Sequence, residues 1–221
     1  MKVFDLGRMD YVEAWERQRV LVDRRAAGDV PDTVLLCEHP HVVTLGRALR
    51  GSAAGENGHL TGPDGTPVPV FRIERGGQAT YHGPGQLVAY VVARLDRARL
   101  CLDGFLRALE TAVIRTAADF DVAAISNPGA TGVWVRGASP PSAGPAGMLK
   151  LASIGIAVRR WVTYHGLALN VSPDLRYFGL IRPCGFDPAV MTSLAQVRGS
   201  PVDLAQVKSR LAHHLRDVLD A

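Results

Sequence analysis

Three stretches of the chain space their apolar residues as amphipathic helices do. Residues 11–27 set apolar side chains near helical spacing among charges, and Gly28 follows as a helix-ending residue. Residues 99–120 and 203–221 carry apolar side chains at mixed three- and four-residue intervals. The pattern predicts a surface helix at 11–27 and two further helices that pack on a sheet.

Short runs rich in β-branched residues predict strands in much of the remaining chain. Two of them lie within residues 33–46, where Pro40 separates them. The others are expected at residues 69–74, 86–95, 132–135 and 151–162, and another opens at His165. Helices intermixed with strands, some of them adjacent as in hairpins, favour an α/β (α+β) fold in which helices flank a mixed β-sheet.

Two segments, 50–69 and 137–147, are rich in glycine, proline and serine. These residue types favour turns and irregular backbone. We therefore expect both segments to be mobile surface loops that contain few strand residues.

Composition indicates a soluble protein of one domain. The chain has 221 residues, of which 47% are hydrophobic, enough for one sizeable core. We therefore expect a single catalytic domain over residues 1–221. No apolar run approaches the roughly 20 residues that cross a bilayer, and residues 1–15 mix charges into the region where a signal peptide is apolar. We expect a cytoplasmic protein that does not associate with membranes.

Positive charge exceeds negative charge, with 25 Lys and Arg against 21 Asp and Glu, a net +4. This balance favours encounters with acidic partners. The basic residues are scattered and no RNA-binding aromatic signature accompanies them, so nucleic acid is not an expected partner. Only Lys2, Lys150 and Lys208 are lysines, so a chain that otherwise uses arginine has kept a lysine at position 150.

A cluster of glycines and polar residues, RGGQATYHGPGQ, occupies positions 75–86. Its four glycines and one proline argue against an ordinary strand, and they allow the backbone to approach a ligand closely. Arg75, Thr80, Tyr81 and His82 supply polar groups around that backbone. We interpret the cluster as a substrate-gripping loop, with a glycine-rich hairpin of no function as the alternative. It is not a phosphate-binding P-loop, because the chain contains no Gly-Lys pair.

One of the three cysteines is placed as a reactive thiol would be. Cys184 lies between Pro183 and Gly185, which predicts an exposed turn. Cys37 and Cys101 lie in apolar settings, where a thiol most often packs inertly in the core. An odd number of widely separated cysteines fits no disulfide framework. For Cys184, a structural turn cysteine is the alternative.

A nucleophilic thiol needs a cation or a base beside it. Lys150, in a largely apolar strand-like run, is one candidate, because lysine can give up a proton in dry surroundings and arginine cannot. The alternative is an edge-strand lysine with its ammonium in water. His165 is the other candidate, and a hydrogen-bonded core histidine is an equally good interpretation of it.

Metal and glycosidase chemistry find no support in the pattern. His39 and His41 flank Pro40 without further ligands at short spacing, so no metal site is expected. Paired carboxylates with catalytic spacing are also missing.

Four blocks of sequence together resemble the octanoyltransferase family of lipoate biosynthesis. They are residues 75–87, 150–155 and 162–171, and Pro183–Gly185 followed by 191–194, and they occur in the family order. The resemblance implies a fold shared with biotin and lipoate protein ligases and no cofactor. It also implies a transferase of protein lipoylation, which moves octanoyl from acyl carrier protein to a lysine on lipoyl domains of dehydrogenase complexes and on the glycine cleavage H protein.

The resemblance assigns Cys184 as the nucleophile that carries an acyl thioester, and Lys150 as the lysine that stabilises its thiolate. The acyl-binding residues that it implies are Arg75, Gly76, Gly77, Gln78, Ala79, Thr80, Tyr81, His82, Ser153, Ile154, Gly155, Gly166, Leu167 and Ala168. Small residues there would let an acyl chain run between backbones. Each buried methylene contributes about 0.8 kcal/mol, so pocket length can select chain length. Ala79, where a β-branched residue is expected, and a long insert at 137–147 depart from the family pattern.

Three alternatives remain open at this point. An ATP-dependent lipoate or biotin ligase on the same fold would need a nucleotide site and no nucleophilic cysteine. A non-catalytic paralogue would only bind acyl or lipoyl carriers. A thiol hydrolase would use His165 as the base for Cys184.

Overall fold

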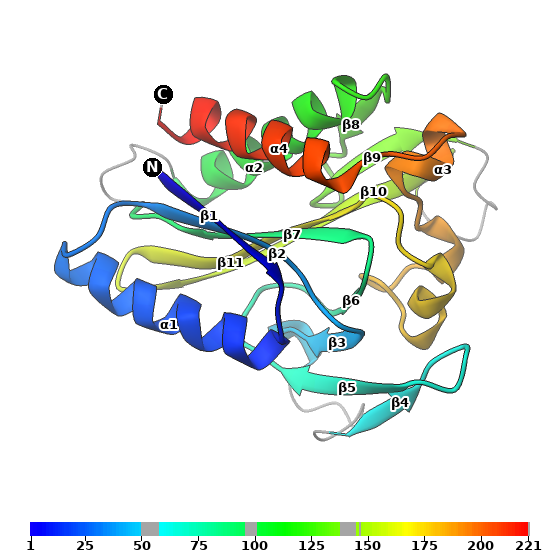
Figure 1. Ribbon diagram of the computed structural model, residues 1–221, viewed down its shortest axis with the longest axis horizontal. Coiled ribbons are helices and arrows are strands. Elements are labelled where there is room, and N and C mark those ends of the chain that lie inside the picture. The colour runs from blue at the N-terminus through cyan, green and yellow to red at the C-terminus, as the bar shows by residue number, and fades with distance from the viewer. Residues whose placement is uncertain (50–57, 96–100, 138–144, 146, 221) are drawn as a thin grey trace.

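The computed structural model describes residues 1–49, 58–95, 101–137, 145 and 147–220. These residues form two β-sheets with helices packed around them (Figure 1). Residues 50–57, 138–144 and 146, which belong to the two expected loops, lie outside the described part of the chain.

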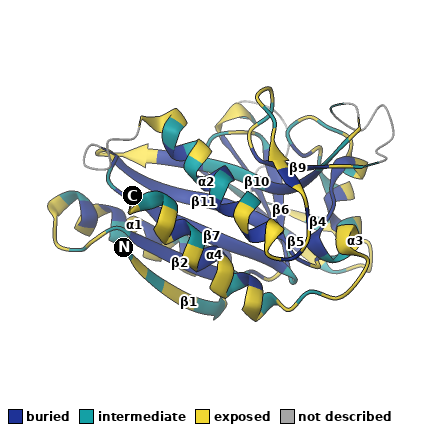
Figure 2. Cartoon of the chain, turned by 90° about the horizontal axis from the view of Figure 1, so that it is seen from above, coloured by how far each residue is buried: buried dark blue, intermediate teal, exposed yellow. Residues whose placement is uncertain are grey.

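Seven strands form the larger sheet, in the order β1-β2-β7-β11-β10-β9-β8. Their bounds are Lys2–Arg8 for β1, Thr33–Glu38 for β2, Gln86–Val92 for β7, Ala124–Ser126 for β8, Val133–Arg136 for β9, Met148–Arg159 for β10 and Val162–Asn170 for β11. β1 and β2 run parallel, and the other neighbours are antiparallel. Every residue of β7 and β11 is buried, because these central strands are covered on both faces (Figure 2).

Four strands form the smaller sheet, in the order β4-β5-β3-β6. Their bounds are Val42–Leu45 for β3, His59–Thr61 for β4, Pro67–Arg72 for β5 and Ala79–His82 for β6. Two short 3-10 helices, η2 (Leu175–Leu180) and η3 (Pro188–Val190), pack on this sheet around a core rich in aromatic rings. A third 3-10 turn, η1, spans Arg47–Leu49.

The helices are α1 (Tyr11–Ala27), α2 (Leu102–Ala118), α3 (Leu194–Arg198) and α4 (Leu204–Leu219). α2 and α4 cover one face of the larger sheet, and α1 and the smaller sheet lie on the other (Figure 1). Asp10 caps α1 by accepting the backbone N–H groups of Val12 and Glu13, and Gly28 ends it with a φ of 92°. Within the described residues, the helices are too short or too polar to span a bilayer.

The predicted fold class is confirmed, since helices flank mixed sheets. The helix at 11–27 has the predicted bounds, and the other two predicted helices match α2 and α4 to within a few residues. The strands predicted within 33–46 and at 86–95 are β2, β3 and β7.

Two predictions about loops were wrong, and one strand near the N-terminus was missed. The cluster at 75–86 does contain a strand, β6, because its glycines flank the run Ala79–His82 and leave that run free to pair with β3. The segment 50–69 holds β4 and the start of β5, which pair with each other. β1 was not predicted, and it is held by parallel pairing to β2.

The strand predicted at 151–162 ends early in a tight turn. β10 stops at Arg159, and Arg160 and Trp161 turn the chain into β11 with φ values of 51° and 62°. Two consecutive positive φ values suit the two-residue hairpin turns that normally carry asparagine and glycine. The sequence lacks the asparagine and glycine that usually indicate such a turn, so its pattern predicts one continuous strand over residues 151–162.

Candidate active site

The segment that carries Cys184 is tied to both sheets. Pro183 pairs with Ala79 at the start of β6, and Met191 pairs with Lys150 on β10. The N–H of Thr192 also donates to the carbonyl of Lys150 at 3.0 Å. Cys184 itself has a φ of 55°, an unusual conformation for a residue with a side chain. These links fix the cysteine turn across the strand that carries Lys150.

The thiol of Cys184 and the ammonium of Lys150 are in contact. Lys150 Nζ lies 3.4 Å from Cys184 Sγ. Lys150 is 1% exposed, on a strand that lies between two others, whereas Cys184 is partly exposed. An edge lysine with its ammonium in water is thereby excluded. A lysine at this distance from a cysteine sulfur is one of the surroundings in which reactive cysteines are found.

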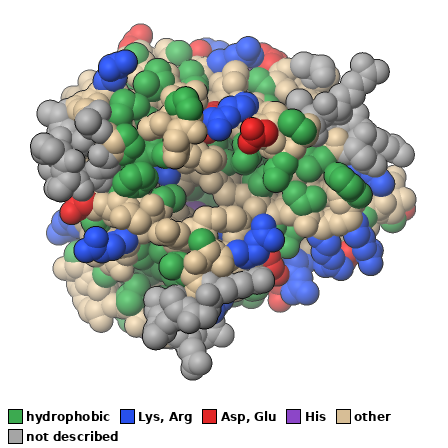
Figure 3. All heavy atoms as spheres, turned by 180° about the vertical axis from the view of Figure 1, so that it is seen from behind, with side chains coloured by type: hydrophobic (Ala, Val, Ile, Leu, Met, Phe, Trp, Pro, Cys, Tyr) green, Lys and Arg blue, Asp and Glu red, His purple; other side chains and the backbone are tan. Residues whose placement is uncertain are grey.

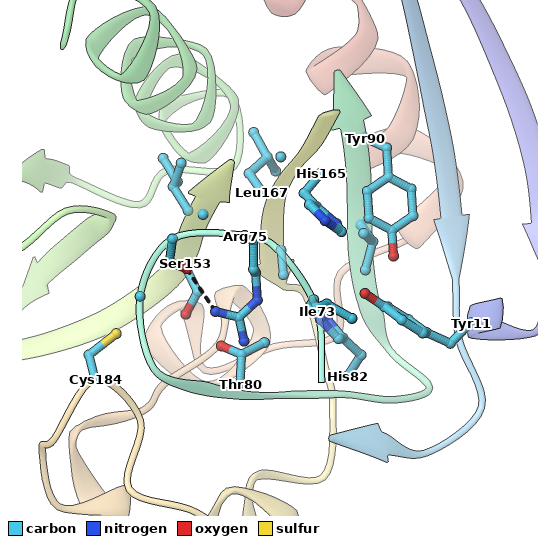
Figure 4. Close-up of a pocket in the computed structure, with 17 residues that line it drawn as sticks. Tyr11, Ile73, Arg75, Thr80, His82, Tyr90, Ser153, His165, Leu167 and Cys184 are labelled. Carbon is cyan, nitrogen blue, oxygen red and sulfur yellow. Dashed lines mark hydrogen bonds between the residues drawn. The ribbon is translucent and has the colours of Figure 1, made fainter. Parts of the chain in front are cut away.

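A cavity of about 480 Å³, counting its open mouth, begins at Cys184 and runs between the two sheets. Its lining residues are Tyr11, Ile73, Arg75, Gly76, Gly77, Thr80, His82, Val88, Tyr90, Ser153, Ile154, Gly155, His165, Gly166, Leu167, Ala168 and Cys184. Figure 4 shows Cys184 on one side of this pocket, with Tyr11, His82, Tyr90 and His165 grouped on the other side and Arg75 between them. In Figure 3 a histidine is visible at the base of a hollow near the centre of the face.

The amino-acid sequence matches the lipoyl protein ligase A/B catalytic domain over residues 10–216. It is 44% identical to the octanoyltransferase of Syntrophotalea carbinolica over 219 residues, which cover 99% of this chain and 94% of that protein. The chain belongs to the octanoyltransferase family.

Solved structures of ligases share the fold of this octanoyltransferase family member. The bipartite lipoate protein ligase of Thermoplasma acidophilum aligns with a TM-score of 0.65 at 15% identity, over 99% of this chain and 83% of that one. The biotin protein ligase of Aquifex aeolicus aligns with a TM-score of 0.53 at 11% identity, over 100% of this chain and 69% of that one. The predicted biotin/lipoate ligase-like fold is confirmed.

Strand register explains why two distant triplets line the pocket together. Ser153, Ile154 and Gly155 of β10 stand directly opposite Ala168, Leu167 and Gly166 of β11. Gly166 also allows close strand packing, since a Cβ at this position would lie 2.0 Å from the carbonyl oxygen of Ala89 on β7. All six residues that the family resemblance assigned on this hairpin line the pocket.

Five of the eight residues at 75–82 that were expected to bind the acyl chain line the pocket. Arg75, Gly76, Gly77, Thr80 and His82 line the pocket. The remaining three, Gln78, Ala79 and Tyr81, do not. Side chains alternate along a strand, so Ala79 and Tyr81 face away from Thr80 and His82. Gln78 and Ala79 instead line a neighbouring groove with Arg182 and Gly185, and Tyr81 stacks on Tyr177.

Arg75 braces the pocket wall. Its guanidinium donates to the carbonyl and the hydroxyl of Thr44 at 2.8 and 2.9 Å, and to the carbonyl of Gly76 at 3.0 Å. Burial lowers the pKa of Arg75, an effect that nearby Tyr11 and Cys184 oppose. The N–H of Gly76 donates to the carbonyl of Ile156 on β10 at 2.9 Å, which fastens this loop to the larger sheet.

The inner end of the pocket is polar and uncharged. His82 Nδ1 lies 2.8 Å from Gln86 Oε1, and burial lowers the pKa of His82 to about 3. The Tyr90 hydroxyl lies 2.7 Å from His39 Nε2, and burial lowers the pKa of His39 as well. Since His39 Nδ1 lies 2.7 Å from the carbonyl of Met9, it carries the proton and Nε2 accepts from Tyr90.

Four lining residues were not predicted: Tyr11, Ile73, Val88 and Tyr90. A signal existed for two of them, since Val88 and Tyr90 are two residues apart on a predicted strand and therefore share a face. Tyr11 begins a helix predicted to lie on the surface, and only the packing of α1 on the sheet brings it to the pocket.

His165 lines the inner end of the pocket, apart from Cys184 (Figure 4). It is 2% exposed, with a φ of 60°; its N–H donates to Gln18 Oε1 at 2.8 Å, and its Nε2 lies 3.7 Å from Glu74 Oε2. Burial lowers the pKa of His165, against the opposing effect of Glu74. The group in contact with the thiol is Lys150, so the geometry does not favour a cysteine-histidine hydrolase.

The two other cysteines differ from each other. Cys37 is fully buried, as expected, and burial raises its pKa to about 12. Cys101 is exposed, contrary to the expectation of core packing, because it caps α2 by accepting the N–H of Gly104 at 3.4 Å. Among the described residues, metal-ligand spacing occurs at His213, His214 and Asp217 on α4, across the sheet from the pocket.

Proposed function

We propose that this chain transfers an octanoyl group from octanoyl-acyl carrier protein to a lysine of a lipoyl domain, through a thioester on Cys184. The observation that carries the proposal is the 3.4 Å contact between Lys150 Nζ and Cys184 Sγ at the mouth of a buried pocket. Family membership supports the octanoyl cargo. The archaeal lipoylation system, whose bipartite lipoate protein ligase shares this fold and was analysed with its E2 lipoyl domain, supports a lipoyl-domain acceptor.

The first half-reaction moves the acyl group onto the enzyme. The Cys184 thiolate attacks the carrier thioester, and the carbon–sulfur bond to the carrier breaks. The Lys150 ammonium gives its proton to the departing carrier thiolate. The products are an acyl thioester on Cys184, a neutral Lys150 amine and a free carrier thiol. Because one thioester replaces another, this exchange is nearly neutral in free energy.

The second half-reaction forms the amide. The neutral amine of the acceptor lysine attacks the acyl carbon, and the neutral Lys150 takes the proton that the new bond releases. The Cys184 thiolate leaves, and the starting pair of ammonium and thiolate is restored. An amide is more stable than a thioester, so the sequence needs no ATP.

Partners, compartment and domain organisation belong to the same proposal. The donor is octanoyl-acyl carrier protein, and the acceptors are lipoyl domains and the glycine cleavage H protein, in the cytoplasm. A net charge of +4 suits acidic partners, although the positive side chains are spread over several places on the face in Figure 3. A family match to residues 10–216 supports one catalytic domain over the whole chain.

A transfer assay without ATP tests the function. Octanoyl-carrier protein and a lipoyl domain are mixed with enzyme, and the acceptor's mass is followed. We expect one octanoyl group to appear on the acceptor, and Cys184→Ala to abolish the transfer. Cys101→Ala is the matched control, since Cys101 is exposed and outside the pocket. A requirement for ATP would favour the ligase alternative, and free octanoate in place of the modified acceptor would favour a hydrolase.

A further inference from the structure

The Lys150 ammonium has few partners. It is buried, and within the described part of the chain its one hydrogen-bond partner is Cys184 Sγ. The face of the Trp134 ring lies beneath it, with Nζ 5.1 Å from the ring centroid. An ammonium within about 6 Å of an aromatic face is attracted to the ring's negative quadrupole, more strongly when water is excluded.

Trp134 is held firmly in this position. Its ring is fully buried, and it stands directly opposite Lys150 in the pairing of β9 with β10. Its Nε1 donates to the carbonyl of Ala130 at 2.9 Å. Phe186, two residues after Cys184, packs edge-on against the ring at 5.7 Å. Trp134 therefore touches both the lysine and the cysteine turn.

Most other charged groups on the surrounding elements have partners of their own, and Arg136 on β9 and Arg182 on the cysteine turn are exposed. Glu110 of α2 pairs with Arg107 and accepts the N–H of Gly132. Asp187 caps η3, and Glu74 faces His165. Arg75, across the pocket, donates to Thr44 and Gly76, and Arg136 is exposed at the end of β9. Among the described residues, the Lys150 ammonium makes its hydrogen bond to Cys184 and its cation–π contact to Trp134.

We propose that Trp134 is a positioning residue that holds the Lys150 ammonium by its ring face and biases Lys150 toward its protonated form. The inference rests on the proposed function. The ring favours the first half-reaction, which starts from ammonium and thiolate, and restrains the second, which uses Lys150 as a neutral base. Once Cys184 is acylated, no thiolate faces the lysine, and the ring is the cation-stabilising contact that remains.

A series of fluorinated tryptophans separates this role from packing, because fluorine drains the ring's quadrupole and nearly preserves its shape. The parent carries Trp15→Phe and Trp161→Phe, so that Trp134 is the remaining tryptophan. Rapid-quench mass spectrometry follows acylation and acceptor transfer separately over a range of pH. Across the series we expect the rate of acylation to fall by up to about tenfold. The rate of acceptor transfer rises with pH, and we expect this rise to occur about one pH unit lower.

Two outcomes would overturn the inference: rates that do not change across the series, or both half-reactions slowed by the same factor. Phe186→Leu is the packing control, since it alters the contact with the ring and leaves the ring's charge distribution intact. It should not shift the pH at which the transfer rate rises. If the enzyme with all three tryptophans forms no acyl adduct on Cys184, the proposed function fails. If the adduct forms and the rates of acylation and transfer do not change across the fluorinated series, only the proposed role of Trp134 fails.

Discussion

The two ends of the pocket differ in charge and in secondary structure. At the mouth, a buried lysine meets a cysteine on a turn with left-handed backbone. At the inner end, Tyr11, His82 and Tyr90 present polar groups that stay neutral, on strands and a helix. Lys150 and Cys184 thus lie at one end and neutral polar groups at the other, with the Arg75 guanidinium on the wall between them. Under the proposed function, the inner end recognises the acyl chain by apolar contact and by pocket length.

The largest expected effect concerns the charged end. Lys150→Arg retains a cation for the thiolate and removes the ability to exchange a proton. We expect turnover with both protein substrates to fall by about a hundredfold or more, while thermal unfolding shows that the variant is folded. Lys208→Arg is the matched control, because Lys208 only pairs with Asp5 on the surface, at 3.1 Å. Near-normal turnover in Lys150→Arg would confine Lys150 to an electrostatic role.

The wall between the two ends depends on close strand packing. Gly166→Ala places a Cβ 2.0 Å from the carbonyl oxygen of Ala89, so the strands must separate. We expect a loss of about 2–4 kcal/mol in the free energy of unfolding, measured by denaturant titration. A Cβ at Gly179 meets no atom within 4 Å, so Gly179→Ala should cost far less. Equal losses in the two variants would contradict the packing argument.

The neutral inner end predicts acid sensitivity. The pKa of His82 falls from 6.5 to about 3 on folding, so between these values the unfolded chain binds a proton that the folded protein does not. Stability therefore decreases as the pH falls through this window, by about 1.4 kcal/mol per pH unit for this one group. His82→Gln should flatten the dependence measured by denaturant titration. His213→Gln, on the exposed side of α4, should leave it unchanged, and an unaltered slope in His82→Gln would contradict the assignment.

The smallest expected effect separates two tyrosines of the inner end. The Tyr90 hydroxyl donates to His39, whereas the Tyr11 hydroxyl has no hydrogen-bond partner among the described residues. Tyr90→Phe removes this bond and leaves His39 Nε2 facing the thiol of Cys37, a weaker donor at 3.5 Å, so it should cost about 1–3 kcal/mol of stability. Tyr11→Phe should cost less and raise the preference for decanoyl over octanoyl by a few fold, in competition between carrier substrates, since the inner end becomes more apolar. Identical effects of the two changes would contradict this distinction.

Much of the scaffold could be predicted from the sequence, because its signals are local. The amphipathic pattern of 11–27 and the apolar run of β7 were sufficient. β6 and the turn at Arg160 and Trp161 were not predictable: glycines hid the first, and the second lacks the residues that normally make it. β1 is a strand through its pairing with β2, which is a tertiary effect.

The site shows the same division. Lysine usage, a Pro-Cys-Gly turn and the family resemblance singled out Cys184 and Lys150, and the structure brings their side chains together. Tyr11 could not be foreseen at the inner end, since it reaches the pocket through the packing of α1, whereas Tyr90 shares a face with Val88 on a predicted strand. Tyr81 and His82 are neighbours in the block 75–87, and the resemblance assigned both to acyl binding. Side chains alternate along β6, so the two face opposite sides of the strand.

The most direct test of the central claim is peptide-mapped mass spectrometry of the enzyme after mixing with octanoyl-carrier protein alone. The account predicts one octanoyl group, attached to the peptide that contains Cys184, removed by hydroxylamine as a thioester and discharged when a lipoyl domain is added. Cys184→Ser should form no octanoyl adduct that can be transferred to a lipoyl domain. An octanoyl group on Cys101 or on a lysine, or transfer that persists in Cys184→Ser, would contradict it.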